Sequence, residues 1–219
     1  MELKTAKYDL KSYSNVYEPR EDSFLMLDAL ELEITFLNNL KPVFALEVGS
    51  GSGVIITSLA CVLEQCVYFA IDINDQACLA TKNTSQLNQC NIEVLNSNLT
   101  DGLKDCLFDL VIFNPPYVVT DPGEYEKGMI NKAWAGGVSG RNIIDEFIDK
   151  LPNVLSESGV CYLLLLKEND INAIQKILGK LNFTSEIILE RKIVGEHLFI
   201  MKIRKIRGMN KCDLVIELK

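Results

Sequence analysis

Short apolar runs alternate with segments of helical period between residues 43 and 181 of this chain. Each run has the length of a buried strand, and the segments between them carry apolar residues at helical spacing. Strands and helices that alternate in this way form right-handed βαβ units, which build an α/β fold with a mainly parallel sheet between helices. The expected strands are Val43–Val48, Val67–Ile71, Ile92–Leu95, Leu110–Phe113 and Val160–Leu166, and the expected helices are Val54–Leu63, Asp75–Leu87, Asn142–Leu155 and Ile171–Leu181.

Both ends of the chain depart from this alternation. The apolar spacing of Glu21–Leu40 predicts one amphipathic helix ahead of the main fold. After residue 181, the strand-like runs Ser185–Leu189 and Leu198–Ile203 have only a short turn between them, which predicts an antiparallel hairpin closing one edge of the sheet. The run Cys212–Leu218 fits a further strand or a tail. We therefore expect an N-terminal arm with its helix (residues 1–40), a main domain (41–205) and a C-terminal extension (206–219).

The charge balance restricts the expected partners. Thirty acidic and 22 basic side chains give a net charge of −8, and such a surface repels phosphate backbones. Nucleic acid is therefore not an expected partner of the chain alone.

The cysteines indicate reduced thiols. The chain has seven cysteines and one histidine, with no CxxC pair and none of the close ligand spacing of a structural zinc site. We therefore expect no metal and a cytoplasmic location, with the nucleus as a second compartment. The N-terminus lacks an apolar signal segment and the charge-free stretches are too short to span a bilayer, so no membrane attachment is expected.

A glycine-rich loop stands where the first expected strand of the main domain gives way to a helix. Gly49, Gly51 and Gly53 allow a sharp turn and let a ligand reach the helix N-terminus without a Cβ in the way. The GxGxG spacing differs from the dinucleotide fingerprint GxGxxG and suits a nucleoside cofactor that lacks phosphates. Taken alone, the loop also fits a mere tight turn.

Polar side chains follow the next two expected strands. Asp72 stands about 20 residues beyond the glycine loop, where a carboxylate can accept hydrogen bonds from both ribose hydroxyls. The segment Asn96–Leu99 follows the third strand, where a polar side chain can meet an adenine amino group. Together with the loop, these residues predict a nucleoside-binding site.

The segment Asn114-Pro115-Pro116-Tyr117 follows the fourth expected strand. It therefore lies at the carboxyl edge of the sheet, where open α/β sheets bind ligands. The side-chain oxygen of Asn114 and the carbonyl of Pro115 can each accept one N–H of a planar amino group, while Tyr117 stacks on its flat face. Held in this way, the nitrogen points toward an electrophilic methyl group. The alternative interpretation is a rigid loop with a core-packed tyrosine.

With these residues in place, the chain resembles class I S-adenosylmethionine-dependent methyltransferases with an NPPY signature. Within that set it is similar to the eukaryotic and archaeal release-factor glutamine methyltransferases of the HemK family. NPPY is shared with adenine-N6 enzymes, whereas NPPYVVT together with AWAGG and the N-terminal YEPxED is more specific. The matching segments are Val16–Phe24, Leu46–Val54, Asp72–Asn74, Phe113–Thr120, Ala133–Gly137, Gly140–Arg141 and Lys167–Asn169.

The resemblance implies a Rossmann-like fold with a mostly parallel seven-stranded sheet, and it assigns the site residues. Asn114, Pro115 and Tyr117 would be catalytic, and with Pro116 they would bind the substrate amide. The family often has an acidic residue where this chain has Asn98, so a contact to adenine there needs the amide carbonyl. The implied cofactor-binding residues are Ser23, Glu47, Gly49, Gly51, Gly53, Asp72, Ile73, Asn98, Leu99 and Asn114.

The resemblance also implies the substrate and a partner. The substrate would be the glutamine of the Gly-Gly-Gln loop in a class 1 translation release factor, methylated at N5. The partner would be a small zinc-binding activator subunit in a heterodimer. It would add its sheet to an exposed edge, and Ile92–Leu95 is the expected outer strand. An ordinary edge shielded by its polar neighbours is the alternative.

Three other functions remain open at this stage. NPPY alone also fits N6-adenine methylation of nucleic acid, although no basic groove is evident. Methylation of lysine in other proteins requires a charged amine to lose its proton first. A catalytically silent binding module of the same fold is the third alternative.

A few further residues admit both a functional and a structural role. Trp134 lies in the long loop after NPPY and either contributes to binding or packs as a lid over the core. Glu18, Glu21 and Asp22 either orient substrate or favour the helix start through the macrodipole, and we assign them no catalytic step. His197 has no evident acid partner or nearby serine, so we expect a structural role for it.

Overall fold

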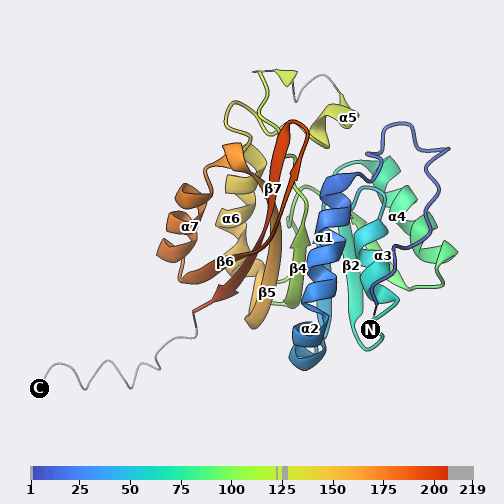
Figure 1. The fold of residues 1–219 in the computed structure, drawn as a ribbon. Coiled ribbons are helices and arrows are strands. Elements are labelled where there is room, and N and C mark those ends of the chain that lie inside the picture. The colour runs from blue at the N-terminus through green and yellow to red at the C-terminus, as the bar shows by residue number, and fades with distance from the viewer. Residues whose placement is uncertain (1, 122, 125–127, 207–219) are drawn as a thin grey trace, which may run out of the picture.

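The computed structural model describes residues 2–121, 123–124 and 128–206, which form one seven-stranded sheet with helices on both faces (Figure 1). The strands are β1 Phe44–Val48, β2 Val67–Asp72, β3 Ile92–Asn96, β4 Phe108–Phe113, β5 Leu155–Leu166, β6 Phe183–Ile193 and β7 Glu196–Lys205. The helices are α1 Glu21–Leu32, α2 Ile34–Leu40, α3 Val54–Ala60, α4 Asp75–Leu87, α5 Met129–Lys132, α6 Asn142–Val154 and α7 Ile171–Lys180, with a short 3₁₀ helix at Lys167–Asn169. The run Cys212–Leu218 lies outside the described residues.

The strand order is β3-β2-β1-β4-β5-β7-β6. Strands β1 to β5 are parallel, and β7 pairs antiparallel with β5 and with β6. This arrangement confirms the predicted parallel sheet and its antiparallel C-terminal hairpin. Strand β7 lies inside the sheet, so β6 forms one edge, and β3 forms the other edge, as the sequence predicts.

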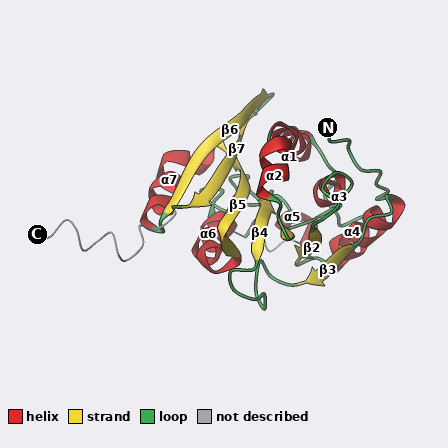
Figure 2. Cartoon of the chain, turned by 90° about the horizontal axis from the view of Figure 1, so that it is seen from below, coloured by secondary structure: helices red, strands yellow, loops and turns green. Residues whose placement is uncertain are grey.

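The helices divide between the two faces of the sheet. Figure 2 shows α1, α3 and α4 on one face and α6 and α7 on the other. Between these layers β5 is buried from Gly159 to Leu166, because it pairs with a strand on either side and is covered on both faces. Among the described residues, no helix is long and apolar enough to cross a membrane.

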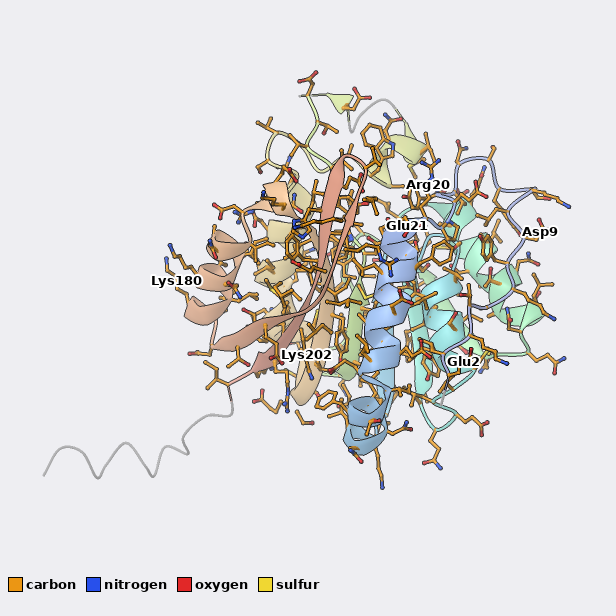
Figure 3. All side chains as sticks on the ribbon, in the orientation of Figure 1. Glu2, Asp9, Arg20, Glu21, Lys180 and Lys202 are labelled. Carbon is orange, nitrogen blue, oxygen red and sulfur yellow. The ribbon has the colours of Figure 1, made fainter. Side chains whose placement is uncertain are left out.

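The predicted single helix over Glu21–Leu40 is wrong, because the structure has two helices that meet at Glu33. Glu33 has φ −88° and ψ 0°, which ends α1. Its carboxylate accepts hydrogen bonds from Tyr162 of β5, at 2.8 Å, and from Lys202 of β7. Figure 3 labels Lys202, which lies on the part of β7 next to this junction. The break is thus stabilised by tertiary contacts, which local periodicity does not encode.

The order of the strands sets the position of the site. The chain runs outward from β1 through β2 to β3 and then returns to the other side of β1 as β4. Ligands of open α/β sheets bind at such a switch point, outside the carboxyl ends of the strands. The glycine loop after β1, Asp72 at the end of β2 and Asn114 after β4 therefore meet at one edge.

Candidate active site

The glycine loop connects β1 to α3 through three residues in the left-handed region, with φ +64° at Gly49, +52° at Gly51 and +74° at Gly53. A Cβ at Gly53 would lie 2.7 Å from Cα of Thr81 on α4, so this glycine allows α3 and α4 to pack closely. A Cβ at Gly51 would meet no atom within 4 Å. Space is therefore open beside Gly51, which also lines a pocket.

The carboxylate of Asp72 is held by backbone donors. Its Oδ2 accepts a hydrogen bond of 2.9 Å from Gly51 N, and its Oδ1 accepts one of 2.9 Å from Asn74 N. Burial raises the pKa of Asp72 despite these hydrogen bonds. Burial also raises the pKa of Glu47, which is 2% exposed and accepts a hydrogen bond of 3.1 Å from Ile56 N. A buried carboxyl group, Glu47, and a half-buried one, Asp72, thus lie beside the glycine loop, where they can accept hydrogen bonds from hydroxyl or amino groups.

A single pocket brings together most of the predicted cofactor-binding residues. Those that line it are Ser23, Glu47, Gly49, Gly51, Asp72, Ile73, Asn98, Leu99 and Asn114, together with the predicted substrate-binding residue Pro116. The predicted residue Gly53 is not among the lining residues and lies instead against Thr81. Several other lining residues were not predicted to bind the cofactor, among them Tyr17, Met129, Lys132, Ala133 and Ile143. Asp22, for which a substrate-orienting and a structural role were both predicted as alternatives, also lines the pocket. Tyr17 and Asp22 fall within the YEPxED segment, which was the available signal for them.

Asn114 joins this pocket to the N-terminal helix. Its Nδ2 donates a hydrogen bond of 3.1 Å to Oδ2 of Asp22, which is 4% exposed at the start of α1. The other polar atom of the amide, Oδ1, is buried and has no hydrogen-bond partner among the described residues. An unpaired buried acceptor is costly, so its retention next to a pocket points to a donor supplied by a ligand.

The backbone after Asn114 is held by a buried asparagine. Asn169, in the 3₁₀ helix, donates from Nδ2 to the carbonyl of Tyr117 at 2.9 Å and to that of Gly140 at 3.2 Å. Its Oδ1 accepts from Leu166 N at 2.7 Å. A Cβ at Gly140 would lie 2.3 Å from the Tyr117 carbonyl oxygen, so the close approach requires glycine there. The Gly140–Arg141 and Lys167–Asn169 segments thus support the NPPY loop.

A second cavity of about 470 Å³ adjoins the first and opens beside the NPPY loop. Tyr17, Glu18, Arg20, Asp22, Tyr117, Trp134 and Glu196 are among its lining residues. Figure 3 shows Arg20 at the end of α1 that faces the loops after β4. Burial, and after it the Asp22 carboxylate, raises the pKa of both tyrosine hydroxyls, which therefore stay protonated at neutral pH. Burial, with Asp22 and Glu168 adding to it, also raises the pKa of Glu196.

The remaining predicted residues lie in different places. Tyr117 is 6% exposed and packs against the core, as the structural alternative predicts, and it also lines the second cavity. Pro115 is buried and lines neither cavity. Trp134 lines the second cavity. His197 contacts Glu190 at 3.1 Å and the ring of Phe199 away from both cavities.

Comparison with known proteins decides the family. Residues 28–188 match the family described as methyltransferase small domain. The chain belongs to this family. The methyltransferase is 40% identical over 198 residues to Methyltransferase HEMK2 of Homo sapiens, a match that covers 89% of this chain and 92% of the human protein. It is 34% identical over 218 residues to the eRF1 methyltransferase catalytic subunit mtq2 of Schizosaccharomyces pombe. This match covers 92% of the chain and 94% of the yeast protein.

A solved structure supports the same relationship. The methyltransferase superposes with a TM-score of 0.68 and 28% identity on a chain of the E. cuniculi Mtq2-Trm112 complex, which methylates the eRF1 translation termination factor. The match covers 87% of this chain and 99% of that chain. The predicted membership of the HemK family and the predicted class I methyltransferase fold are thereby confirmed.

The residues of the pocket fit the methyl donor of this family, S-adenosylmethionine. The open space beside Gly51 leaves room for a ligand against the loop, and the carboxyl groups of buried Glu47 and half-buried Asp72 supply acceptors. The side chains of Ile73 and Leu99 add apolar surface suited to a flat base. The unpaired Oδ1 belongs to Asn114, which lines the same pocket.

Proposed function

We propose that this methyltransferase transfers a methyl group from S-adenosylmethionine to N5 of the glutamine in the Gly-Gly-Gln loop of a class 1 translation release factor. The observation that carries the proposal is the buried, unpaired Oδ1 of Asn114 in the wall of the cofactor pocket. A neutral amide NH₂ offers the donor that this oxygen lacks. The eRF1 methyltransferases of fission yeast and E. cuniculi, which match nearly the whole chain, supply the identity of the substrate.

The cofactor is bound by residues from the first three strands. The Asp72 carboxylate accepts hydrogen bonds from the ribose hydroxyls, and the Asn98 side-chain carbonyl accepts one from the adenine amino group. Glu47 and Ser23 complete the polar wall. When bound, S-adenosylmethionine supplies an electrophilic methyl group next to the NPPY loop.

The acceptor nitrogen is bound and oriented by the NPPY loop. Oδ1 of Asn114 accepts one N–H of the glutamine amide, which disfavours delocalisation of the nitrogen lone pair into the amide carbonyl. The carbonyl of Pro115 accepts the second N–H only once the substrate loop has bound, since Pro115 lines neither cavity in the free chain. Tyr117 bounds the cavity through which the side chain enters. Fixed acceptors of this kind act by position and electrostatics, because they need no reorganisation during the transfer.

The lining of the second cavity disfavours the adenine alternative. Glu18, Asp22 and Glu196 contribute carboxylates there, against the single guanidinium of Arg20. A phosphodiester backbone entering this cavity would be repelled, and the whole chain has a net charge of −8. A polypeptide loop meets no such barrier.

The same carboxylates favour a second candidate function, which is methylation of lysine in other proteins. Acidic side chains attract a lysine ammonium, and the raised pKa of Glu196 makes it a better proton acceptor than an ordinary glutamate. Mass spectrometry of basic protein substrates after incubation with the enzyme tests this activity.

The partner that we propose is a small zinc-binding activator subunit that adds its sheet to β3. The E. cuniculi relative forms a complex with Trm112. In this chain β3 is an edge strand, and the exposed leucines Leu79, Leu87 and Leu95 lie on β3 and on α4, which packs against it. Exposed apolar side chains beside an unpaired strand favour β-augmentation by another protein.

The decisive experiment uses the heterodimer, labelled S-adenosylmethionine and a release factor. We expect label on the wild-type factor and none on the factor with Gln→Ala in its Gly-Gly-Gln loop. Equal labelling of both factors would contradict the assignment. Peptide mapping by mass spectrometry then locates the methylated residue.

A further inference from the structure

Asp22 and Asn114 form a directed hydrogen bond between the N-terminal helix and the NPPY loop. Nδ2 of Asn114 donates to Oδ2 of Asp22 at 3.1 Å, across 92 positions of sequence. Asp22 is 4% exposed and lines both the cofactor pocket and the second cavity, whereas Asn114 lines the cofactor pocket. The pair therefore lies where the two substrates meet.

The two oxygens of Asp22 have different partners. Oδ1 accepts hydrogen bonds from the N–H of Ser23 at 2.7 Å and from its hydroxyl at 3.3 Å, which ties this oxygen to the first turn of α1. The orientation of the carboxylate is fixed by its own helix, so Oδ2 is presented to Asn114.

A carboxylate in this position determines which way the asparagine amide faces. The amide carries a donor nitrogen and an acceptor oxygen that exchange places on a half-turn, and an ionised carboxylate only accepts hydrogen bonds. With Asp22 on one side, Nδ2 must face it and Oδ1 must face away, which is the arrangement that leaves Oδ1 buried and unpaired. The flipped amide would place two oxygens against each other and is disfavoured.

We infer that Asp22 is a positioning residue for methyl transfer, which fixes the Asn114 amide with its oxygen toward the acceptor nitrogen. The inference rests on the proposed function, because it requires Oδ1 to accept an N–H of the substrate. The carboxylate also polarises the amide through the Nδ2 hydrogen bond, and this strengthens Oδ1 as an acceptor. Asp22 exchanges no proton with the substrate. Its carboxylate also faces the hydroxyls of Tyr17 and Tyr117, so the test must isolate its effect on Asn114.

The inference predicts the kinetics of three variants in the heterodimer. Asp22→Asn removes the charge and permits both amide orientations, so kcat falls by about 10- to 100-fold, while the Kd of S-adenosylmethionine changes by less than about threefold. Asn114→Asp places two carboxylates against each other and lowers kcat further. The double variant Asp22→Asn with Asn114→Asp restores a donor opposite an acceptor and again presents an oxygen to the substrate. We expect the kcat of the double variant to be at least about tenfold higher than that of Asn114→Asp alone.

The matched control is Glu21→Gln, the adjacent acid of the same helical turn. Glu21 is exposed, lines neither cavity and accepts a hydrogen bond from Arg191 of β6 at 3.1 Å. Its substitution leaves kcat unchanged. Either of two results would overturn the inference: a wild-type kcat in Asp22→Asn, or a double variant no faster than Asn114→Asp. If the Asp22 carboxylate were merely structural, swapping the acid and the amide between positions 22 and 114 would not restore activity.

A spectroscopic measurement separates this inference from the proposed function. In the ¹⁵N-labelled heterodimer, the side-chain N–H protons of Asn114 exchange slowly with solvent, and Asp22→Asn accelerates the exchange. This result holds whatever the methyl acceptor is. If the Asn114 side-chain protons exchange slowly in the wild type but the release factor is not methylated, only the proposed substrate is contradicted. If these protons exchange at the same rate in the wild type and in Asp22→Asn, the role of Asp22 is contradicted.

Discussion

Oδ2 of Asp72 accepts a hydrogen bond of 2.9 Å from the backbone N–H of Gly51, which joins the end of β2 to the centre of the glycine loop. The second oxygen is bound by Asn74 N at the same distance. The backbone N–H of Ile73 is a third donor to this carboxylate. Because a carboxylate offers about four acceptor positions, some acceptor capacity is left for a ligand. The carboxylate is therefore oriented toward the cofactor pocket before the cofactor binds.

This orientation predicts the effect of Asp72→Asn. The substitution removes the charge that ribose hydroxyls favour and replaces one acceptor by a donor, so we expect the Kd of S-adenosylmethionine to rise about 10- to 100-fold. The kcat at saturating cofactor changes little, since the contact is the same in the ground state and the transition state. Isothermal titration calorimetry measures the Kd, with Asp75→Asn as the exposed neighbouring control. An unchanged Kd in Asp72→Asn would refute the assigned contact.

Asn114→Ala is expected to show the reverse pattern. It removes an acceptor whose bond to the substrate nitrogen strengthens at the transition state, so kcat falls by about 100-fold or more. The Kd of S-adenosylmethionine rises only slightly, because Asn114 contributes one of many side chains that line the pocket. Steady-state kinetics and calorimetry on the same preparation separate the two effects. Equal losses in kcat and in cofactor affinity contradict the role of Asn114.

Glu47 gives a prediction about stability and pH. Burial raises the pKa of this carboxyl group well above its ordinary value of 4.5, and the Asp72 carboxylate adds to the rise. Above pH 4.5 the unfolded chain has lost this proton while the folded protein still holds it, so the contribution to stability falls as the pH rises toward the folded-state pKa. Because glutamine does not titrate, Glu47→Gln is expected to abolish this loss of stability with rising pH.

The measurement is thermal unfolding of the cofactor-free protein across a pH series. At neutral pH, Glu47→Gln should have a higher Tm than the wild type and bind S-adenosylmethionine more weakly, which is the usual exchange of stability for function at a binding site. The gap in Tm should narrow as the pH is lowered. A variant that is less stable than the wild type at neutral pH would show that the ionised carboxylate stabilises the fold.

The sequence predicts the sheet and the edge where the site lies, but not the contacts across it. Periodicity identifies the parallel strands, and a ligand site at their carboxyl ends follows from the topology alone. The bond between Asp22 and Asn114 connects residues 92 positions apart, and acidic residues at a helix start have an adequate local explanation. The break between α1 and α2 at Glu33 depends likewise on Tyr162 and Lys202, which lie on strands far along the sequence.

Two glycines of the same loop are expected to fail in different ways. Gly53→Ala forces a Cβ to within 2.7 Å of Thr81 Cα, so α3 and α4 must separate, at a cost of about 1–3 kcal/mol of unfolding free energy. Gly51→Ala meets no atom within 4 Å and costs only the strain of a left-handed alanine, about 1 kcal/mol. Because Gly51 lines the cofactor pocket, the added methyl group is expected to compete with the cofactor for space and raise its Kd. Denaturant unfolding and calorimetry of both variants test this division, and a larger stability loss in Gly51→Ala contradicts it.

The edge strand β3 gives the last prediction, which concerns the heterodimer. Leu95 on β3 is 41% exposed, and Leu79 on α4 is 54% exposed, so a partner sheet that extends β3 would bury apolar surface here. Leu95→Lys places a charge beside the unpaired strand, a device by which natural edges resist pairing. Affinity for the activator should fall by more than about tenfold, since a desolvated lysine opposes association. Leu32→Lys at the end of α1, where the leucine is 66% exposed, is the control and should bind normally. Biolayer interferometry measures both, and undiminished binding of Leu95→Lys would place the activator on a different surface.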